Sequence, residues 1–256
     1  MLAISFASRG TYGGVVWTLT LANYANVVDP LYVRIFARSV GLATLTTLLC
    51  LALGFPIAYY IARLPPRLQG IWLLLVMIPF WTNFLVRTYA WIFILRAEGL
   101  LNTVLAGLGL IGSPVDVLYS ETAIVIGLVY GYLPFMILPL YAAVERLPVA
   151  LVEAAWDLYA SRWAVFWRVI VPLTKPGLVA GAILVFIPSV GAFITPDLMG
   201  GARTMMIGNL IQHEFLVARD WPFGSAIGLV LMASVLLGVV TYLRAEGPGA
   251  RPAAGG

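Results

Sequence analysis

The sequence has 256 residues, of which 62% are hydrophobic and 10% are charged, and its mean hydropathy is +0.98. Soluble domains average about 45–50% apolar and about 25% charged residues. A chain this poor in charge cannot cover a water-facing surface. The composition therefore predicts a membrane protein and excludes a soluble enzyme.

The few charges also exclude several kinds of site. The 15 basic and 11 acidic residues give a net charge of +4. They are scattered without a basic run, so no nucleic-acid partner is expected. With one histidine, His213, and one cysteine, Cys50, no His/Cys metal site is expected. The phosphate-loop pattern G-x-x-x-x-G-K-[ST] does not occur, so we expect any nucleotide to be bound by a partner.

Taken in chain order, five apolar stretches are each long enough to cross a bilayer as a helix, which needs about 20 residues. They cover residues 35–61, 71–95, 122–144, 177–196 and 223–243. Together they predict an all-α, polytopic transmembrane domain over residues 35–243. The first four stretches contain prolines, which a helix bundle tolerates. These prolines act either as kinks that shape packing or as a gating hinge.

Both ends of the chain lie outside this domain. Residues 1–34 contain no clean membrane span, and they lack the basic leader of a signal peptide. The side holding segments 62–70 and 145–176 has slightly more Lys and Arg and is predicted to be cytoplasmic, which makes residues 1–34 an extracytoplasmic segment. Residues 244–256, rich in Gly, Pro and Ala, are predicted to be a disordered cytoplasmic tail.

Segment 145–176 is too polar to insert but carries two helical patterns. Apolar residues recur at i, i+3, i+4 and i+7 from Leu151 to Leu158, and again from Trp163 to Ile170. Glu153 is expected in the first turn of the first helix, where the helix dipole favours an acid. Prolines before and after the patterns are expected to mark the helix ends. The segment therefore predicts two short amphipathic helices at the membrane face, where such a pair can lie in the lipid headgroups.

This segment resembles the EAA loop of bacterial ABC importer permeases. The matching residues are Glu153, Ala154, Ala155, Asp157, Leu158, Ala160, Ser161, Val169, Val171, Pro172, Pro176 and Gly177. The resemblance implies a coupling helix that docks into a groove on a cytoplasmic ATPase, with the two alanines allowing close approach and Glu153 making polar contacts. The family usually has glycine where this chain has Tyr159, so a different turn or backbone strain is expected there.

The resemblance covers nearly the whole chain and narrows to the first permease subunit of spermidine/putrescine importers. It rests on eight short motifs: Asn23-Tyr24, Asp29 to Tyr32, Pro79 to Asn83, Arg87 to Tyr89, Leu133 to Met136, Pro139 to Tyr141, Asp197 to Gly201, and Arg219 to Gly224. Such permeases are type I importer bundles of typically six spans, the first lying before the point where this chain begins. We therefore expect either a start codon assigned too late or a shortened subunit.

The resemblance also implies the setting in which the chain works. It is expected to be a multi-pass protein of the bacterial inner membrane, without catalytic residues or a cofactor of its own. Its expected partners are a dimer of ABC ATPases that binds ATP and Mg²⁺, a second homologous permease subunit, an extracytoplasmic substrate-binding protein and the lipid bilayer.

Candidates for the substrate path are chosen by chemistry. A polyammonium ion needs carboxylates for its charge and aromatic rings for cation–π attraction. On the second predicted span, Asn83, Arg87 and Trp91 share one helical face, which either lines an outer vestibule or anchors the helix at the interface. Arg87 would repel a cation unless an acid neutralises it or the residue acts as a gate.

The remaining path candidates are rings and acids near the span ends. Trp81 and Tyr130 are candidate rings, although such residues also form belts at membrane interfaces. Asp197, just past the fourth span, is the best-placed acid, and Glu121 at the start of the third span is the next.

Two other protein classes and one nearer alternative stay open. A self-sufficient secondary carrier or channel usually shows internal repeats and acids deep in a span, and the sequence shows neither convincingly. A membrane enzyme needs paired carboxylates, a metal cluster or an activated nucleophile at membrane depth. An ABC permease for another small solute is the nearer alternative, because a binding protein usually sets selectivity.

Overall fold

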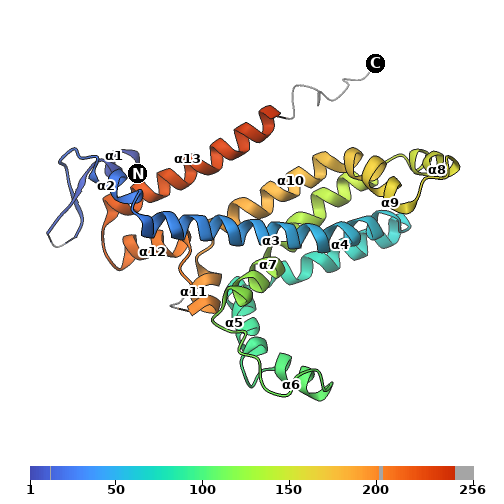
Figure 1. Cartoon of the computed structure of the whole chain (residues 1–256), viewed down its shortest axis with the longest axis horizontal. Helices are drawn as coiled ribbons and strands as arrows, with labels where there is room; N and C mark the ends of the chain where they lie inside the picture. Colours follow the sequence, from blue (N-terminus) through green and yellow to red (C-terminus); the bar gives the residue numbers. More distant parts are fainter. Residues whose placement is uncertain (12, 202–203, 246–256) are drawn as a thin grey trace. The chain divides into compact units, whose positions relative to one another are not determined.

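The structure, a computed structural model, describes residues 1–11, 13–201 and 204–245. The described chain is almost entirely helical (Figure 1). It divides into two compact units, one formed by Met1–Ala37 with Ile207 onward and the other by Arg38–Met206. The boundary falls inside the long helix α3 (Pro30–Ala62).

The second unit, Arg38–Met206, holds most of the apolar core. Besides α3 it comprises α4 (Pro66–Trp81), α5 (Phe84–Leu95), α6 (Leu100–Gly107), α7 (Glu121–Glu145), α8 (Val149–Asp157), α9 (Arg162–Val165), a π-helical turn (Phe166–Ile170), α10 (Val171–Val190) and α11 (Ile194–Gly200). Its main core cluster is built around Cys50, Ile61, Met136, Leu140 and Val185, all fully buried. Helices α3, α7 and α10 therefore form the centre of this unit.

The first unit contains the chain start and the last long helix. Its elements are α1 (Leu2–Ser5), β1 (Ser8–Arg9), β2 (Val15–Val16), α2 (Ala22–Val27), the first turns of α3, α12 (Ile207–Leu216) and α13 (Trp221–Ala245). The two short strands pair antiparallel. The buried Asn23 amide donates to the carbonyls of Ser5 and Ala7 at 2.9 and 2.8 Å, so the chain start is held by specific hydrogen bonds. Of the predicted tail 244–256, residues 246–256 lie outside the described residues.

Within the described residues, five helical segments are long and apolar enough to cross a membrane. They are Pro30–Ala62, Phe84–Gly107, Glu121–Glu145, Arg162–Val190 and Trp221–Thr241, and α4 is a shorter apolar helix. The all-α, polytopic class predicted from the sequence is confirmed. The second and fourth predicted spans nevertheless differ from the helices that form.

The prediction of one continuous second span over 71–95 is wrong. Thr82 and Asn83 have extended ψ angles of 149° and 131°, and they separate α4 from α5. Pro79 lies in the last turn of α4, and the Thr82 hydroxyl donates to its carbonyl at 2.7 Å. The Asn83 side chain accepts from the backbone N–H groups of Leu85 and Val86 and caps α5. Local capping thus outweighs the continuous apolar composition.

The fourth predicted span, 177–196, is also displaced. Helix continues from Arg162 through the π-helical turn into α10 and ends at Val190, so the second amphipathic helix is the first part of this span. Pro172 and Pro176 do not end it. The Val171 N–H bonds to the carbonyl of Phe166, five residues back, and this register shift lets the helix pass Pro172 near the start of α10.

Helices α7 and α10 approach closely at Gly177 and Gly181. A Cβ atom on Gly177 would lie 2.6 Å from the Pro139 carbonyl oxygen, and one on Gly181 would lie 2.7 Å from the Met136 sulfur. Real Cβ atoms do not come this close to backbone oxygen, so the absence of a side chain at Gly177 permits the contact.

Replacing Gly177 by alanine is expected to destabilise the chain by about 1–3 kcal/mol, because the added methyl overpacks the α7–α10 contact. Thermal unfolding of the purified, detergent-solubilised protein measures the effect. Gly70→Ala on α4 is the matched control: nothing lies within 4 Å of its added Cβ, so no loss of stability is expected. Equal unfolding temperatures for the two variants would contradict the close-packing account.

Candidate functional site

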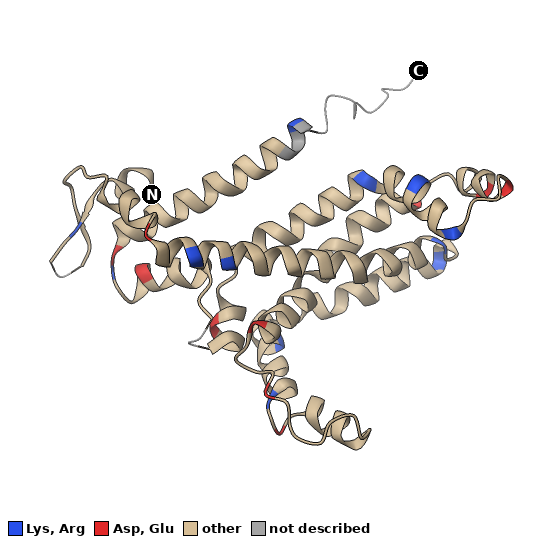
Figure 2. Cartoon of the chain, viewed as in Figure 1, with Lys and Arg blue, Asp and Glu red and all other residues tan. Residues whose placement is uncertain are grey.

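The turn between α3 and α4 and the end of α7 meet at one end of the second unit. The Tyr141 hydroxyl hydrogen-bonds to Gln69 Oε1 at 3.1 Å and to Glu145 Oε1 at 2.8 Å. The Gln69 amide in turn donates to the carbonyls of Ala62 and Leu64. Figure 2 shows charged residues gathered at this end, with long uncharged stretches of helix beyond it. The end is therefore a polar cap on an apolar bundle.

Helix α8 packs beside α9 and the π-helical turn by a narrow face and leaves the rest exposed. Val152 is 2% exposed, and Ala155 packs with it against the core. Leu151, Glu153, Ala154, Asp157 and Leu158 are all exposed. Of the apolar stripe predicted from the sequence, Ala155 thus contacts the core, whereas Leu151, Ala154 and Leu158 face outward. Glu153 is the fifth residue of α8, so the prediction that it lies in the first turn of the helix is wrong.

Tyr159 ends α8 in a left-handed conformation, with φ of +57°. The Tyr159 N–H bonds to the Trp156 carbonyl at 2.8 Å, and the Ala160 N–H bonds to the Ala155 carbonyl at 3.1 Å. This pair of bonds is the Schellman motif, whose left-handed position is usually glycine. The expected alternative, a different turn, is not adopted; the tyrosine takes the conformation that glycine would take, with its side chain 97% exposed.

Replacing Tyr159 by glycine is expected to stabilise the protein by about 0.5–1 kcal/mol. A side chain in the left-handed region costs about 1–2 kcal/mol, and the greater freedom of glycine in the unfolded chain offsets part of the gain. Thermal unfolding of the purified protein measures the change. Tyr159→Ala keeps a Cβ atom and is expected to give no comparable gain. A loss of stability in Tyr159→Gly would contradict this reading of the turn.

The turn after α8 leads directly into α9. The Ser161 hydroxyl accepts from the Ala164 N–H at 3.2 Å and caps the helix. Ala160 packs against the core while Ser161 and Arg162 are exposed. The predicted coupling residues 153–161 therefore form one ridge, α8 and its turn, which is exposed except at Ala155 and Ala160. Pro172 lies apart from this ridge, inside the continuous helix of α9, the π-helical turn and α10.

Arg87 organises the break between α4 and α5. Its Nη1 donates to the Pro79 carbonyl at 3.1 Å; this carbonyl, in the last turn of α4, also accepts from the Thr82 hydroxyl. Its guanidinium carbon lies 5.3 Å from the Phe84 ring centre, 5.8 Å from that of Tyr130 and 6.0 Å from that of Phe80, within cation–π range. Arg87 is therefore held by one carbonyl and three rings.

The structure brings some of the predicted path residues together and separates others. Trp91 packs edge-on against Tyr130 with ring centres 5.3 Å apart, beside Arg87. The prediction that Asn83 shares a helical face with Arg87 is wrong, because Asn83 lies before α5 and caps it. Trp81 and Asp197 are exposed on α4 and α11.

The second-choice acid, Glu121, is already paired. Arg38 Nε donates to its carboxylate at 2.6 Å. This pair lies within the second unit and neutralises both side chains. Glu121 is therefore not an uncompensated acid for a cationic solute.

The first unit contains a polar cavity of about 480 Å³ that the sequence analysis did not identify. It is lined by three carboxylates, Asp29, Glu214 and Asp220, and by one cation, Arg9. The carboxylates have local roles: Asp29 accepts from the Leu31 N–H, Asp220 from the Phe223 N–H, and Glu214 lies 3.5 Å from His213. The cavity is acidic, and its carboxylates hold helix starts and loops in place.

Comparison with known proteins gives one family and a set of relatives. The family model described as "Binding-protein-dependent transport system inner membrane component" matches residues 51–245. The spermidine/putrescine transport system permease protein PotB of Haemophilus influenzae is 43% identical over 246 residues, covering 96% of this chain and 86% of the relative. PotB of Escherichia coli K12 is also 43% identical over 246 residues, covering 96% and 90%.

A solved structure shares the fold at low sequence identity. A chain in the crystal structure of a bacterial alginate ABC transporter, in complex with an alginate pentasaccharide-bound periplasmic protein, aligns with a TM-score of 0.71 and 16% identity. The alignment covers 87% of this chain and 81% of that one.

Proposed function

The chain belongs to the family of binding-protein-dependent transport system inner membrane components, and from that premise we propose that it is a permease subunit of an ATP-driven importer for the polyamines spermidine and putrescine. It is a multi-pass, non-catalytic subunit. ATP and Mg²⁺ are bound by partner ATPases, a second permease completes the pore, and an extracytoplasmic binding protein delivers the solute.

The proposal that the solute is a polyamine rests on proteins to which this chain is clearly similar in sequence. Two proteins named as spermidine/putrescine permeases are 43% identical to this chain over 96% of its length. The rings of Trp91 and Tyr130 and the acidic cavity of the first unit are compatible with a cationic solute. Membership of this family also sets aside the self-sufficient secondary carrier and the membrane enzyme.

The ridge of α8 and its turn, residues 153–161, is the proposed dock for the ATPase. It is exposed, ends in a hydrogen-bonded cap and joins α10 through one continuous helix. A displacement of α8 can therefore be transmitted through the π-helical turn and α10 to the α7–α10 contact at the centre of the second unit. ATP-driven closure of the ATPases would then switch the bundle between outward-open and inward-open states.

Uptake of labelled spermidine and putrescine tests the substrate. A bacterial strain lacking its own polyamine importers receives the complete importer, with this chain or without it. Uptake that requires this chain and is competed by unlabelled spermidine, but not by molybdate, is expected. Uptake that is the same with and without the chain would overturn the proposal.

A further inference from the structure

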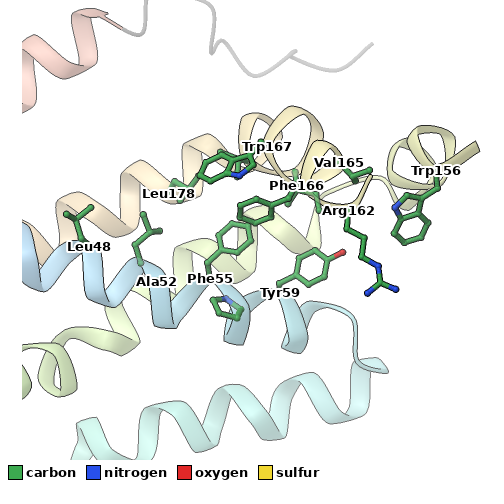
Figure 3. Close-up of a pocket in the computed structure, with 14 residues that line it drawn as sticks. Leu48, Ala52, Phe55, Tyr59, Trp156, Arg162, Val165, Phe166, Trp167 and Leu178 are labelled. Carbon is green, nitrogen blue, oxygen red and sulfur yellow. The ribbon is translucent and has the colours of Figure 1, made fainter. Parts of the chain in front are cut away.

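An apolar groove lies beside the α8–α9 end of the second unit, and Trp156 is the one residue of the α8 ridge among its lining residues. Its volume is about 820 Å³, and it runs between α3 and the helix formed by α9, the π-helical turn and α10 (Figure 3). Its inner wall is aromatic, since Phe55 and Phe166 meet edge-on with ring centres 5.3 Å apart. Among its lining residues only Arg162 is charged.

The mouth of the groove carries two guanidinium groups. Arg162 extends beside Tyr59 and Trp156 (Figure 3). The Arg63 guanidinium lies 5.1 Å from the centre of the Tyr59 ring. In the described part of the chain, neither arginine forms an ion pair with a carboxylate. The mouth is therefore a cationic, aromatic rim above an apolar wall, complementary to an anionic headgroup on a hydrocarbon chain.

The length of the groove matches one leaflet of a bilayer. Its lining on α3 runs from Leu48 to Tyr59, which is about 16 Å along a helix that rises 1.5 Å per residue. One leaflet contributes about 15 Å, half of the hydrocarbon core. A helix of another subunit would cross both leaflets, whereas an acyl chain fills one.

We propose that this groove binds an anionic phospholipid of the inner leaflet, with an acyl chain against Phe55 and Phe166 and the headgroup phosphate between Arg162 and Arg63. The leaflet rests on the proposed function, which places α8 in the cytoplasm. Trp156 and Trp167 line the groove and are exposed, as expected for rings at the headgroup level. The lipid would brace the π-helical turn through which α8 is joined to α10.

Lipid retention by the purified importer tests the proposal. The complete complex is reconstituted with equal amounts of phosphatidylglycerol and phosphatidylcholine, purified again, and its bound lipids are quantified by mass spectrometry. Phosphatidylglycerol is expected to be enriched over phosphatidylcholine. Arg162→Gln is expected to lower that enrichment about fivefold, the effect of about one phosphate-facing cation.

Two controls make the test specific. Arg168→Gln removes an exposed arginine that lies six residues away and does not line the groove, so the enrichment is expected to stay unchanged. Ala52→Phe fills the groove from α3 and is expected to reduce retention of both lipids, whereas Leu53→Phe, on the same helix outside the groove, is not.

Three results would overturn the lipid site. They are bound lipid of the same composition as the bulk, equal losses in Arg162→Gln and Arg168→Gln, and capture of the second permease rather than lipid by a photocrosslinker placed at residue 52. None of these measurements depends on which solute is imported. Failure of the lipid site is therefore distinguishable from failure of the proposed polyamine transport.

Discussion

Replacing Glu153 by lysine is expected to abolish uptake while the chain still inserts and assembles in the membrane. Glu153 is exposed on α8, so reversing its charge disturbs no packed contact within the chain. At the proposed ATPase dock, however, the change replaces a polar contact by a repulsive one. Loss of an interface hot spot costs about 2 kcal/mol or more, which corresponds to at least a thirtyfold weaker association.

Polyamine uptake and co-purification of the ATPase are measured together for Glu153→Lys. Glu98→Lys is the matched control, because Glu98 is an exposed acid of the same unit that lies outside α8. It is expected to retain both uptake and the ATPase. Wild-type uptake in Glu153→Lys, with the ATPase still bound, would show that α8 does not dock there.

Replacing Arg87 by glutamine is expected to lower both uptake and thermal stability. The substitution removes the charge-assisted hydrogen bond to the Pro79 carbonyl and three cation–π contacts. A hydrogen bond from a charged group is worth about 1.5–3 kcal/mol. Because Arg87 joins α5 to the end of α4, its loss is expected to loosen the break between these helices, and Arg87→Lys is expected to restore part of the stability.

The direction of the uptake change separates two roles for Arg87. If its charge mainly repelled a cationic solute in a vestibule, the neutral glutamine would raise uptake. If Arg87 holds the helix break, uptake falls together with the unfolding temperature. Arg96→Gln is the control, since Arg96 is exposed at the end of the same helix and lies over Phe93; little change in either quantity is expected.

Hydropathy was sufficient to predict a helical membrane protein with five candidate spans, because lipid demands long apolar helices. It could not locate the ends of those helices. The break at Thr82 and Asn83 depends on caps, and apolar composition continues across it. Two local signals were present, Pro79 near the end of α4 and Asn83 as a helix cap, and they would have predicted the break.

The structure around α8 could be predicted only in part from the sequence. Its pattern predicted an amphipathic helix, but within the apolar stripe only Ala155 contacts the core, and the fully buried residue of α8 is Val152, which lies outside the stripe. The passage through Pro172 depends on a π-helical turn, which periodicity does not reveal. The grouping of Arg87 with Tyr130 joins residues 43 positions apart, and only the packing of α5 on α7 places them together.

Cysteine cross-linking between α8 and the ATPase tests the central claim most directly. The chain has one native cysteine, Cys50, and it is fully buried, so Leu158→Cys, at a position 81% exposed, introduces one accessible thiol. In the assembled importer, a short bifunctional reagent is expected to link residue 158 to the ATPase, while Leu100→Cys, exposed on α6, is not linked. A reactive thiol at residue 158 that never links to the ATPase would contradict the account.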